Sequence, residues 1–184
     1  MVFKVVLVGC GNLGSRHLQA LKKTKREIAI TVCEPMEAAR KTAVERYAQI
    51  EENPFVKEFQ MLEDYHQLQP DYDLAIVATN AVNRYEIAEW LVEHLEIRYL
   101  ILEKVVFQTL EEFDRFKQKL DERQVKAWVN CARRMYPYYQ ELQPKLADEK
   151  RIDMAVSGGS WGMGSNTIHM LDLYFYLPLK FRPT

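Results

Sequence analysis

The stretch that decides the fold is VVLVGCGNLGSRHLQAL, from Val5 to Leu21. An apolar run ends at Gly9, two more glycines follow at Gly11 and Gly14, and apolar residues then recur at helical spacing. This is the pattern of a strand, a glycine-rich loop and a helix. The loop either holds a phosphate or only makes a tight turn, and the rest of the chain has to decide between these two interpretations.

Short apolar runs rich in branched residues recur along the chain, with helical stretches between them. Their near-continuous hydrophobicity predicts strands of a parallel sheet covered on both faces. Alternation of strand and helix predicts a doubly wound α/β sheet of the Rossmann type. Residues 51–70 are less regular and are expected to hold a short strand or helix at an edge. The expected strands are Phe3–Gly9, Ile28–Glu34, Asp73–Thr79, Tyr99–Lys104 and Val125–Cys131, and the expected helices are Leu13–Lys23, Glu37–Ala48, Arg84–His94 and Leu110–Arg123, the last with a capping box of Thr109 and Glu112.

The pattern changes after Cys131. A helix is expected over 136–150, a new strand over Arg151–Gly159 and a second helix over Ser165–Leu177. One strand and two helices hide too little apolar surface to close a domain of the usual size. We therefore assign residues 1–131 to a Rossmann domain and 132–184 to the beginning of an incomplete second α/β domain, either truncated or completed by association.

The glycine loop has the context that phosphate binding requires, because it follows a strand and opens a helix. In that geometry Gly9 permits the tight turn, Gly11 lets the backbone approach a pyrophosphate, and Gly14 allows close packing of helix and sheet. The backbone amides at the helix start, at Asn12 and Leu13, would then meet the phosphate at the positive end of the helix dipole. The loop is therefore predicted to bind a dinucleotide.

An acidic residue sharpens this prediction. Glu34 ends the second expected strand, 20 residues after Gly14, where a carboxylate can accept hydrogen bonds from the adenosine ribose hydroxyls. Because a carboxylate there repels a 2′-phosphate, NAD is favoured over NADP. A methyltransferase also uses a glycine-rich first loop and an acid after its second strand. Its loop is usually led by an acidic residue, whereas Leu7 and Val8 stand in that place here, so it ranks below the dinucleotide enzyme.

Composition and cysteine spacing exclude several further classes of protein and kinds of site. The 25 lysines and arginines balance 26 acids, for a net charge of −1, which gives no general attraction to nucleic acid or to an anionic membrane. The basic run Lys22–Arg26 lies at the end of a predicted helix, where cations favour the helix dipole. Cys10, Cys33 and Cys131 lie in apolar runs without paired spacing, so buried thiols are expected rather than disulfides or a zinc site. Neither a signal peptide nor an apolar stretch near ~18 residues is seen, and a cytoplasmic location is expected.

Three stretches, RYLILEKVVFQTLEEFDRF (98–116), VGCGNLGSRHL (8–18) and IVATNAVNRYEIAEWLVEH (76–94), together resemble the Gfo/Idh/MocA family of NAD(P)-dependent oxidoreductases. The family's Glu-Lys-Pro motif, with the Thr and Glu-Glu that follow it, corresponds to Glu103-Lys104-Val105, Thr109 and Glu111-Glu112. The resemblance continues in VNCARRMYP (129–137) and GGSWGMGSNTIHMLDL (158–173), so it extends over almost the whole chain.

The resemblance implies hydride transfer between NAD(H) and a secondary alcohol of a sugar, cyclitol or nucleotide-sugar. Lys104 matches the family lysine beside the nicotinamide and the substrate hydroxyl, where an ammonium polarises an alkoxide or passes a proton. His169 matches the histidine that helps to bind and deprotonate that hydroxyl. Glu103 is expected to orient or neutralise Lys104 near the cofactor, or to make a purely structural hydrogen bond. Asp172 is expected to orient a neighbour or to cap structure. The other residues implied are Thr79 and Asn80 for the cofactor, and Asn130, Arg133, Arg134 and Asn166 for the substrate, with interdomain salt bridges left open for the two arginines.

Two departures from the family pattern affect the expected chemistry. Val105 replaces the proline after the lysine, and Ser165 stands where the family often has an Asp. Neither Ser165 nor Asn166 can act as a carboxylate, so proton transfer would rest on Lys104 and His169 or on water. The family's second domain forms the substrate floor and often the oligomer interface, so a homo-oligomer is expected. A non-catalytic dinucleotide-binding module and an idle fragment stay open as alternatives.

Overall fold

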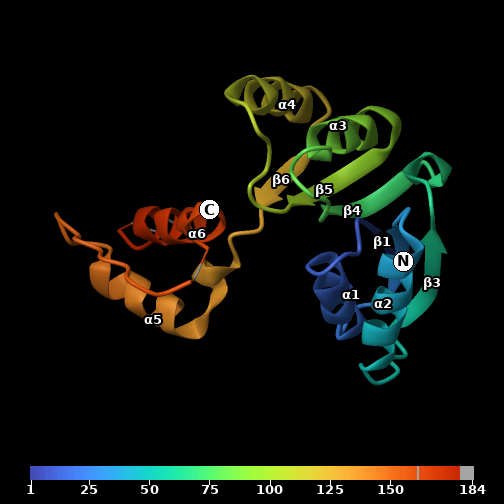
Figure 1. Cartoon of the computed structure of the whole chain (residues 1–184), viewed down its shortest axis with the longest axis horizontal. Coiled ribbons are helices and arrows are strands. Elements are labelled where there is room, and N and C mark those ends of the chain that lie inside the picture. The colour runs from blue at the N-terminus through green and yellow to red at the C-terminus, as the bar shows by residue number, and fades with distance from the viewer. Residues whose placement is uncertain (161, 179–184) are drawn as a thin grey trace. The chain divides into compact units, whose positions relative to one another are not determined.

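A computed structural model describes residues 1–160 and 162–178 of the chain (Figure 1). Its contacts divide the chain into two compact units, Met1–Val129 and a second that begins at Asn130. The first unit contains the sheet, and the second contains the helical segment that follows it.

The first unit is built on one six-stranded sheet with the order β3-β2-β1-β4-β5-β6. All neighbouring strands pair in parallel, which confirms the doubly wound sheet predicted from the alternating pattern. The chain order reverses between β1 and β4, so the crevice outside the carboxyl ends of these two strands is the expected ligand position. The strands are β1 (Phe3–Val8), β2 (Ile28–Cys33), β3 (Val56–Leu62), β4 (Asp71–Val77), β5 (Glu96–Leu102) and β6 (Lys126–Val129).

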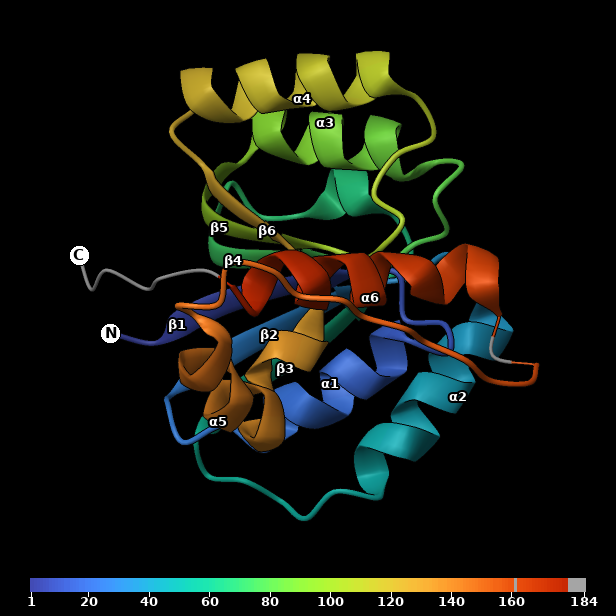
Figure 2. The same cartoon turned by 90° about the vertical axis from the view of Figure 1, so that its left-hand side faces the viewer.

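Helices cover both faces of this sheet. Figure 2 shows α3 and α4 over one face and α1 and α2 over the other. The predicted capping box is present, because the hydroxyl of Thr109 accepts from the amide of Glu112 while the Glu112 side chain accepts from the amide of Thr109. The helices are α1 (Gly14–Lys22), α2 (Glu37–Ala48), α3 (Arg84–His94) and α4 (Leu110–Glu122), in agreement with the predicted ranges to within a residue.

The core lies in two layers because side chains alternate across each strand. Val6 and Val8 face the layer under α3 and α4, whereas Val5 and Leu7 face the layer under α1 and α2. All four are at most 3% exposed. Burial of each such side chain is worth roughly 1.5–3 kcal/mol, which explains why β1 reads as an unbroken apolar run.

The irregular region 51–70 holds β3, at one edge of the sheet, and a short 3-10 helix, η1 (Tyr65–Gln67). Asp64 begins η1 by accepting a hydrogen bond from the amide of His66 at 2.9 Å. The expectation of a short strand or helix at an edge is therefore confirmed.

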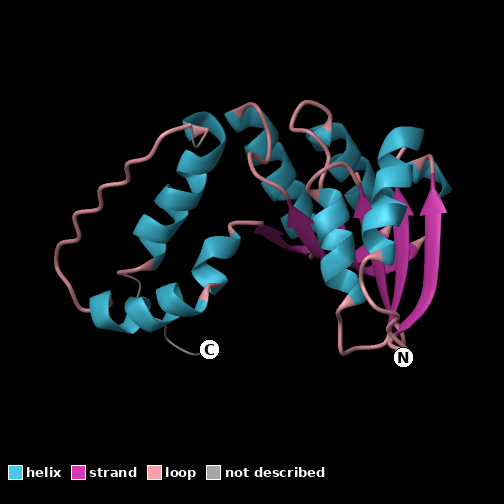
Figure 3. Cartoon of the chain, turned by 60° about the horizontal axis from the view of Figure 1, so that its bottom comes forward, coloured by secondary structure: helices cyan, strands magenta, loops and turns pink. Residues whose placement is uncertain are grey.

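The described part of the second unit is helical. It contains η2 (Ala132–Met135), α5 (Pro137–Leu146) and α6 (Met163–Tyr176). A long loop joins α5 to α6 (Figure 3). Leu173, Tyr176 and Leu177 form its core.

The strand predicted over Arg151–Gly159 is wrong. These residues have no regular structure, and nearly all of them are exposed. Alternating apolar residues form a strand only when the backbone finds a partner to pair with. Residues 130–160 and 162–178 offer no other strand, so Met154 and Val156 stay at the surface.

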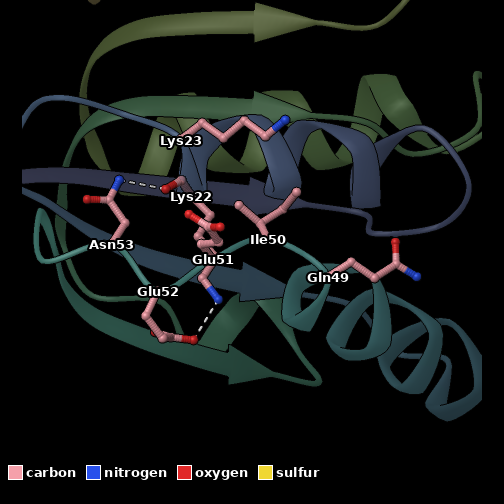
Figure 4. Close-up of a pocket in the computed structure, with 7 residues that line it drawn as sticks. All are labelled: Lys22, Lys23, Gln49, Ile50, Glu51, Glu52 and Asn53. Atoms are coloured by element: carbon pink, nitrogen blue, oxygen red, sulfur yellow. Dashed lines mark hydrogen bonds and ion pairs between the residues drawn. The ribbon is translucent and has the colours of Figure 1, made fainter.

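The basic run contains a buried cation, shown in Figure 4. Lys22 is only 1% exposed, and its ammonium donates to the carboxylate of Glu52 at 2.7 Å and to the carbonyl of Tyr47 at 3.3 Å. Asn53 donates in turn to the carbonyl of Lys22. Lys22 therefore joins the end of α1 to the segment after α2.

The three cysteines are buried free thiols, as expected. Burial, more than the nearby acids, raises the pKa of both Cys10 and Cys33 to about 12. Among residues 1–160 and 162–178, the helices are too short or too polar to cross a membrane.

Candidate functional site

The glycine loop leaves β1 at the point where the chain order reverses. Gly9 has φ +86°, and a Cβ on it would lie 2.9 Å from the amide nitrogen of Thr79. A Cβ on Gly14 would lie 2.0 Å from the carbonyl oxygen of Gly9, whereas one on Gly11 would meet nothing within 4 Å. Gly9 and Gly14 are thus required by close contacts within the protein itself. The space beside Gly11 is open, so a ligand could approach the protein backbone there.

Helix α1 begins directly after this loop. Its N-cap residue, Leu13, makes no side-chain capping bond. The amides of Ser15 and His17 already donate to the carbonyls of Gly11 and Leu13, so the amides left for a ligand are those just before them, at Asn12 and Leu13. Arg46 of α2 braces the loop from outside, donating to the hydroxyl of Ser15 at 2.6 Å and to the side-chain oxygen of Asn12 at 3.3 Å. The loop and helix start therefore fit the pyrophosphate of a dinucleotide, as the glycine spacing predicts.

Glu34 follows β2, and the backbone fixes its carboxylate in place. One oxygen accepts from the amide of Cys10 at 2.9 Å, and the other accepts from the amide of Met36 at 3.0 Å. Each oxygen of an ionised carboxylate can accept a further hydrogen bond. A carboxylate held in this way can receive the two ribose hydroxyls of the adenosine half of NAD.

A guanidinium also lies at this end of the sheet. Arg40 donates to the carbonyls of Glu34 and Pro35, at 2.9 and 2.7 Å, and to the carboxylate of Glu63 at 2.6 Å. Its donors are thus directed to protein acceptors.

A cavity of about 590 Å³ lies at the carboxyl ends of β1, β2 and β4. Its volume is within the range of ligand sites. Five of the predicted cofactor residues line it together, namely Gly9, Gly11, Glu34, Thr79 and Asn80. Asn12, Leu13, Gly14 and Glu103 are not among its lining residues.

Asn80 shapes the rim of this cavity. Its side-chain oxygen accepts from the amides of Val82 and Asn83, which closes a turn just before α3. The turn leaves Thr79 and Asn80 at the end of β4, opposite the glycine loop that follows β1.

Lys104 lies just beyond β5, half-buried, and the peptide bond that joins it to Val105 is cis. The preceding Glu103 is 2% exposed, and its carboxylate lies 2.6 Å from Nε2 of His17. His17 stands on α1, three residues after Gly14. This contact joins the helix of the glycine loop to the segment that carries Lys104.

Two residues of this site were missed in the sequence. His17 lies within the family-like stretch 8–18, one helical turn from the third glycine, which is the signal that could have found it. Arg84 begins α3 and is 3% exposed, yet nothing local in the sequence marks it as buried. Its guanidinium donates to the carbonyls of Thr79 and Glu103.

The residues predicted to bind substrate lie mainly in the second unit. Arg134 makes a bidentate ion pair with Asp172, with Nε to Oδ2 at 2.9 Å. The hydrogen bond to Asp172 is the main reason that the pKa of Arg134 is raised. This ion pair lies within the second unit, where Asp172 holds the guanidinium of its neighbour Arg134.

The other predicted residues of the second unit lie on η2 and α6 or just before them. Asn166 and His169 are three residues apart on α6 and so share one helix face. Ser165 donates to the carbonyl of Gly162 at 3.2 Å. Asn130 precedes η2 and Arg133 lies on it. Because Lys104 and His169 belong to different units, their joint role stays a prediction.

The sheet order, the glycine cradle and the acid after β2 define a dinucleotide-binding Rossmann domain. The model of the oxidoreductase family with an NAD-binding Rossmann fold matches residues 3–131. The chain belongs to this family, Gfo/Idh/MocA, which confirms the predicted family and its cofactor, NAD. None of the curated proteins matches the chain.

Solved structures share the fold. An oxidoreductase from Agrobacterium radiobacter, in complex with NAD+, L-tartaric acid and magnesium, is 16% identical, with a TM-score of 0.70 over 100% of this chain and 59% of its own. Myo-inositol dehydrogenase from Lactobacillus casei, in complex with NAD(H) and myo-inositol, is 21% identical. Its TM-score is 0.71, and the match covers 96% of this chain and 54% of the dehydrogenase. The WlbA dehydrogenase from Chromobacterium violaceum, in complex with NADH and UDP-GlcNAcA, is 22% identical. Its TM-score is 0.64, and the match covers 79% of this chain and 39% of WlbA. The chain spans about half the length of these relatives.

Proposed function

We propose that the chain is an NAD(H)-dependent oxidoreductase that transfers a hydride at a secondary alcohol or ketone of a sugar-like substrate. The observation that carries the proposal is the cavity of about 590 Å³, in which Gly9, Gly11, Glu34, Thr79 and Asn80 meet at the switch point of the sheet. Membership of an oxidoreductase family supports the reaction class.

The residues have distinct tasks in this reaction. NAD+, when bound, supplies a hydride acceptor at its nicotinamide ring. The loop backbone from Gly11 to Leu13, at the start of α1, holds the pyrophosphate, and Glu34 holds the adenosine ribose. Lys104 binds the reacting oxygen of the substrate and stabilises the negative charge that develops on it as the hydroxyl proton leaves. His169 takes the hydroxyl proton, because Ser165 cannot act as a base in place of a carboxylate.

The substrate class is proposed from the solved relatives and the candidate residues. Relatives with this fold bind myo-inositol, L-tartaric acid and UDP-GlcNAcA, which all carry secondary hydroxyl groups. Asn130, Arg133 and Asn166 are neutral or cationic hydrogen-bonding groups suited to hydroxyl and carboxylate oxygens. Cyclitols, sugar acids and nucleotide-sugars are therefore the first compounds to test.

The test begins with NADH titration of the protein by fluorescence. Formation of NADH is then followed with myo-inositol, scyllo-inositol, L-tartrate and UDP-GlcNAcA as substrates. The proposal predicts NADH binding, transfer with at least one compound, and loss of transfer but not of NADH binding in Lys104→Met. Lys117→Met, at an exposed lysine of α4, is the matched control and should keep both.

Two outcomes would contradict the proposal. Failure to bind NADH would remove its basis. Tight NADH binding without transfer across a broad panel of cyclitols, sugar acids and nucleotide-sugars would favour a non-catalytic dinucleotide-binding module instead.

A further inference from the structure

A buried arginine holds the backbone on both sides of Lys104. Arg84 is the first residue of α3 and is 3% exposed. Its Nη1 donates to the carbonyls of Glu103 and Val105, and at 3.3 Å to that of Val106. The carbonyl before Lys104 and the carbonyl after it are thus held by the same nitrogen.

The second guanidinium nitrogen reaches a different strand end. Nη2 of Arg84 donates to the carbonyl of Thr79, which lines the cofactor cavity at the end of β4. A guanidinium is planar and presents its donors in a fixed fork, so the two acceptor sets cannot shift independently. Arg84 therefore fixes the segment 103–106 relative to Thr79.

The burial of the Arg84 guanidinium carries an energetic cost that its hydrogen bonds must offset. Burial lowers its pKa, which the nearby charge of Glu103 only partly opposes. Its Nε is also buried and has no acceptor within residues 1–160 and 162–178. A buried cation and an unsatisfied buried donor both cost free energy, and the hydrogen bonds that Arg84 donates to the carbonyls of Thr79, Glu103 and Val105 offset that cost.

We propose that Arg84 is a positioning residue, which holds the backbone of 103–106 so that the ammonium of Lys104 is aimed at the nicotinamide end of the cavity. The inference rests on the proposed function, because it assumes that NADH binds with its nicotinamide near Lys104. Misplacement of a reacting group by about 1 Å can cost about 100-fold in rate, so Arg84 controls transfer without touching the reacting atoms.

The chain offers a matched control in Lys22, the buried cation of Figure 4. Lys22 is equally buried and also holds a backbone carbonyl, that of Tyr47, but it contacts neither Thr79 nor the segment 103–106. Lys22→Met therefore removes a buried cation from the same unit and should lower stability alone.

The experiment measures the protection of Lys104 by NADH. The full chain is treated with N-hydroxysuccinimidyl acetate, with and without saturating NADH, and acetylation of Lys104 is quantified by peptide mass spectrometry. NADH should protect Lys104 in the wild type and in Lys22→Met. Arg84→Lys and Arg84→Gln should lose this protection while they still bind NADH, and with a substrate in hand their kcat should fall by about 100-fold with little change in KM.

Each result decides the question. No protection in the wild type would overturn the proposed placement of NADH, and the Arg84 inference with it. Protection in the wild type and equal protection in both Arg84 variants would overturn the Arg84 inference alone. Circular dichroism checks the fold: if Arg84→Gln unfolds, Arg84→Lys, which keeps the charge but not the fork, decides by itself. If both variants unfold, Arg84 is structural and the inference fails.

Discussion

Replacement of Glu34 by alanine should change which dinucleotide the protein prefers. The carboxylate is 7% exposed, and the amides of Cys10 and Met36 hold it where the adenosine ribose would lie. Glu34→Ala removes the acceptor for the ribose hydroxyls of NAD and also removes the charge that would repel the 2′-phosphate of NADP. Affinity for NAD should fall while affinity for NADP rises.

The size of both effects follows from the geometry. A hydrogen bond to a charged group is worth about 1.5–3 kcal/mol, so losing one such bond weakens NAD by about 10- to 150-fold. Two unit charges about 5 Å apart repel by roughly 3 kcal/mol at an effective dielectric constant of 20. Exposure to water in an open cavity reduces this to about 1–2 kcal/mol, or about 5- to 30-fold in NADP affinity. The ratio of the two dissociation constants should therefore shift by the product of the two effects, about 50- to 4,500-fold.

The assay is a pair of fluorescence titrations, with NADH and with NADPH, on the wild type and on Glu34→Ala. Glu34→Gln is the matched control, because it keeps an acceptor oxygen and the side-chain shape while it removes the charge. It should raise NADPH affinity with a smaller loss of NADH affinity. An unchanged ratio of the two dissociation constants in Glu34→Ala would refute the ribose assignment.

The structure adds a second step to this prediction. Arg40 donates to the carbonyls of Glu34 and Pro35, beside the expected ribose position, and its Nη2 is bound to Glu63 at 2.6 Å. Glu63→Gln removes the charge from this partner and so weakens its hydrogen bond with Arg40. Combined with Glu34→Ala it should raise NADPH affinity beyond the single variant, whereas Glu63→Gln alone should leave the preference for NADH in place because Glu34 remains.

Further predictions concern single contacts of the first unit. Gly14→Ala places a Cβ 2.0 Å from a backbone oxygen and should lower the urea midpoint strongly, whereas Gly11→Ala, with nothing within 4 Å, should keep the wild-type midpoint but weaken NADH binding. His17→Ala leaves a buried carboxylate without its imidazole partner and should cost about 1–3 kcal/mol of unfolding free energy, most of which His17→Gln should restore by donating to the same oxygen. Cys10 and Cys33, whose pKa values burial raises from 9.0 to about 12, should resist iodoacetamide in the native protein at pH 8 and react after unfolding in urea. Because the unfolded thiols ionise near pH 9 and the folded ones do not, unfolding free energy should also fall as the pH rises from about 9 towards 12, and a flat profile there would contradict the burial argument.

The cofactor half of the site could be predicted because its signals are local. The three glycines, the apolar strand before them and Glu34 each carry their meaning in a short window, since a positive φ and close backbone contacts admit only glycine. The ranges of α2 and α3 followed from helical periodicity in the same way.

Contacts between residues far apart in the chain could not be predicted. His17 and Glu103 are 86 residues apart, and only the pairing of β1 with β4 and β4 with β5 brings their elements together. In the sequence, Arg84 has the pattern of an exposed cation at a helix start, but in the folded structure it is buried. The strand expected over Arg151–Gly159 failed for a related reason, because a pattern of alternating residues cannot show whether a partner strand exists.

The two units carry different parts of the site that the family motifs predict: the first holds the residues predicted to bind the cofactor, and the second holds most of those predicted to bind the substrate. The glycine cradle, Glu34 and the cavity belong entirely to the first unit, as does Lys104. His169 and the ion pair of Arg134 with Asp172 belong to the second. We therefore expect the first unit to set cofactor affinity, so that substitutions on α6 change transfer while leaving NADH binding as it is. Lys104 is the predicted catalytic residue that lies with the cofactor cradle, and under the proposed function its placement by Arg84 and by the Glu103–His17 contact would couple cofactor binding to proton handling.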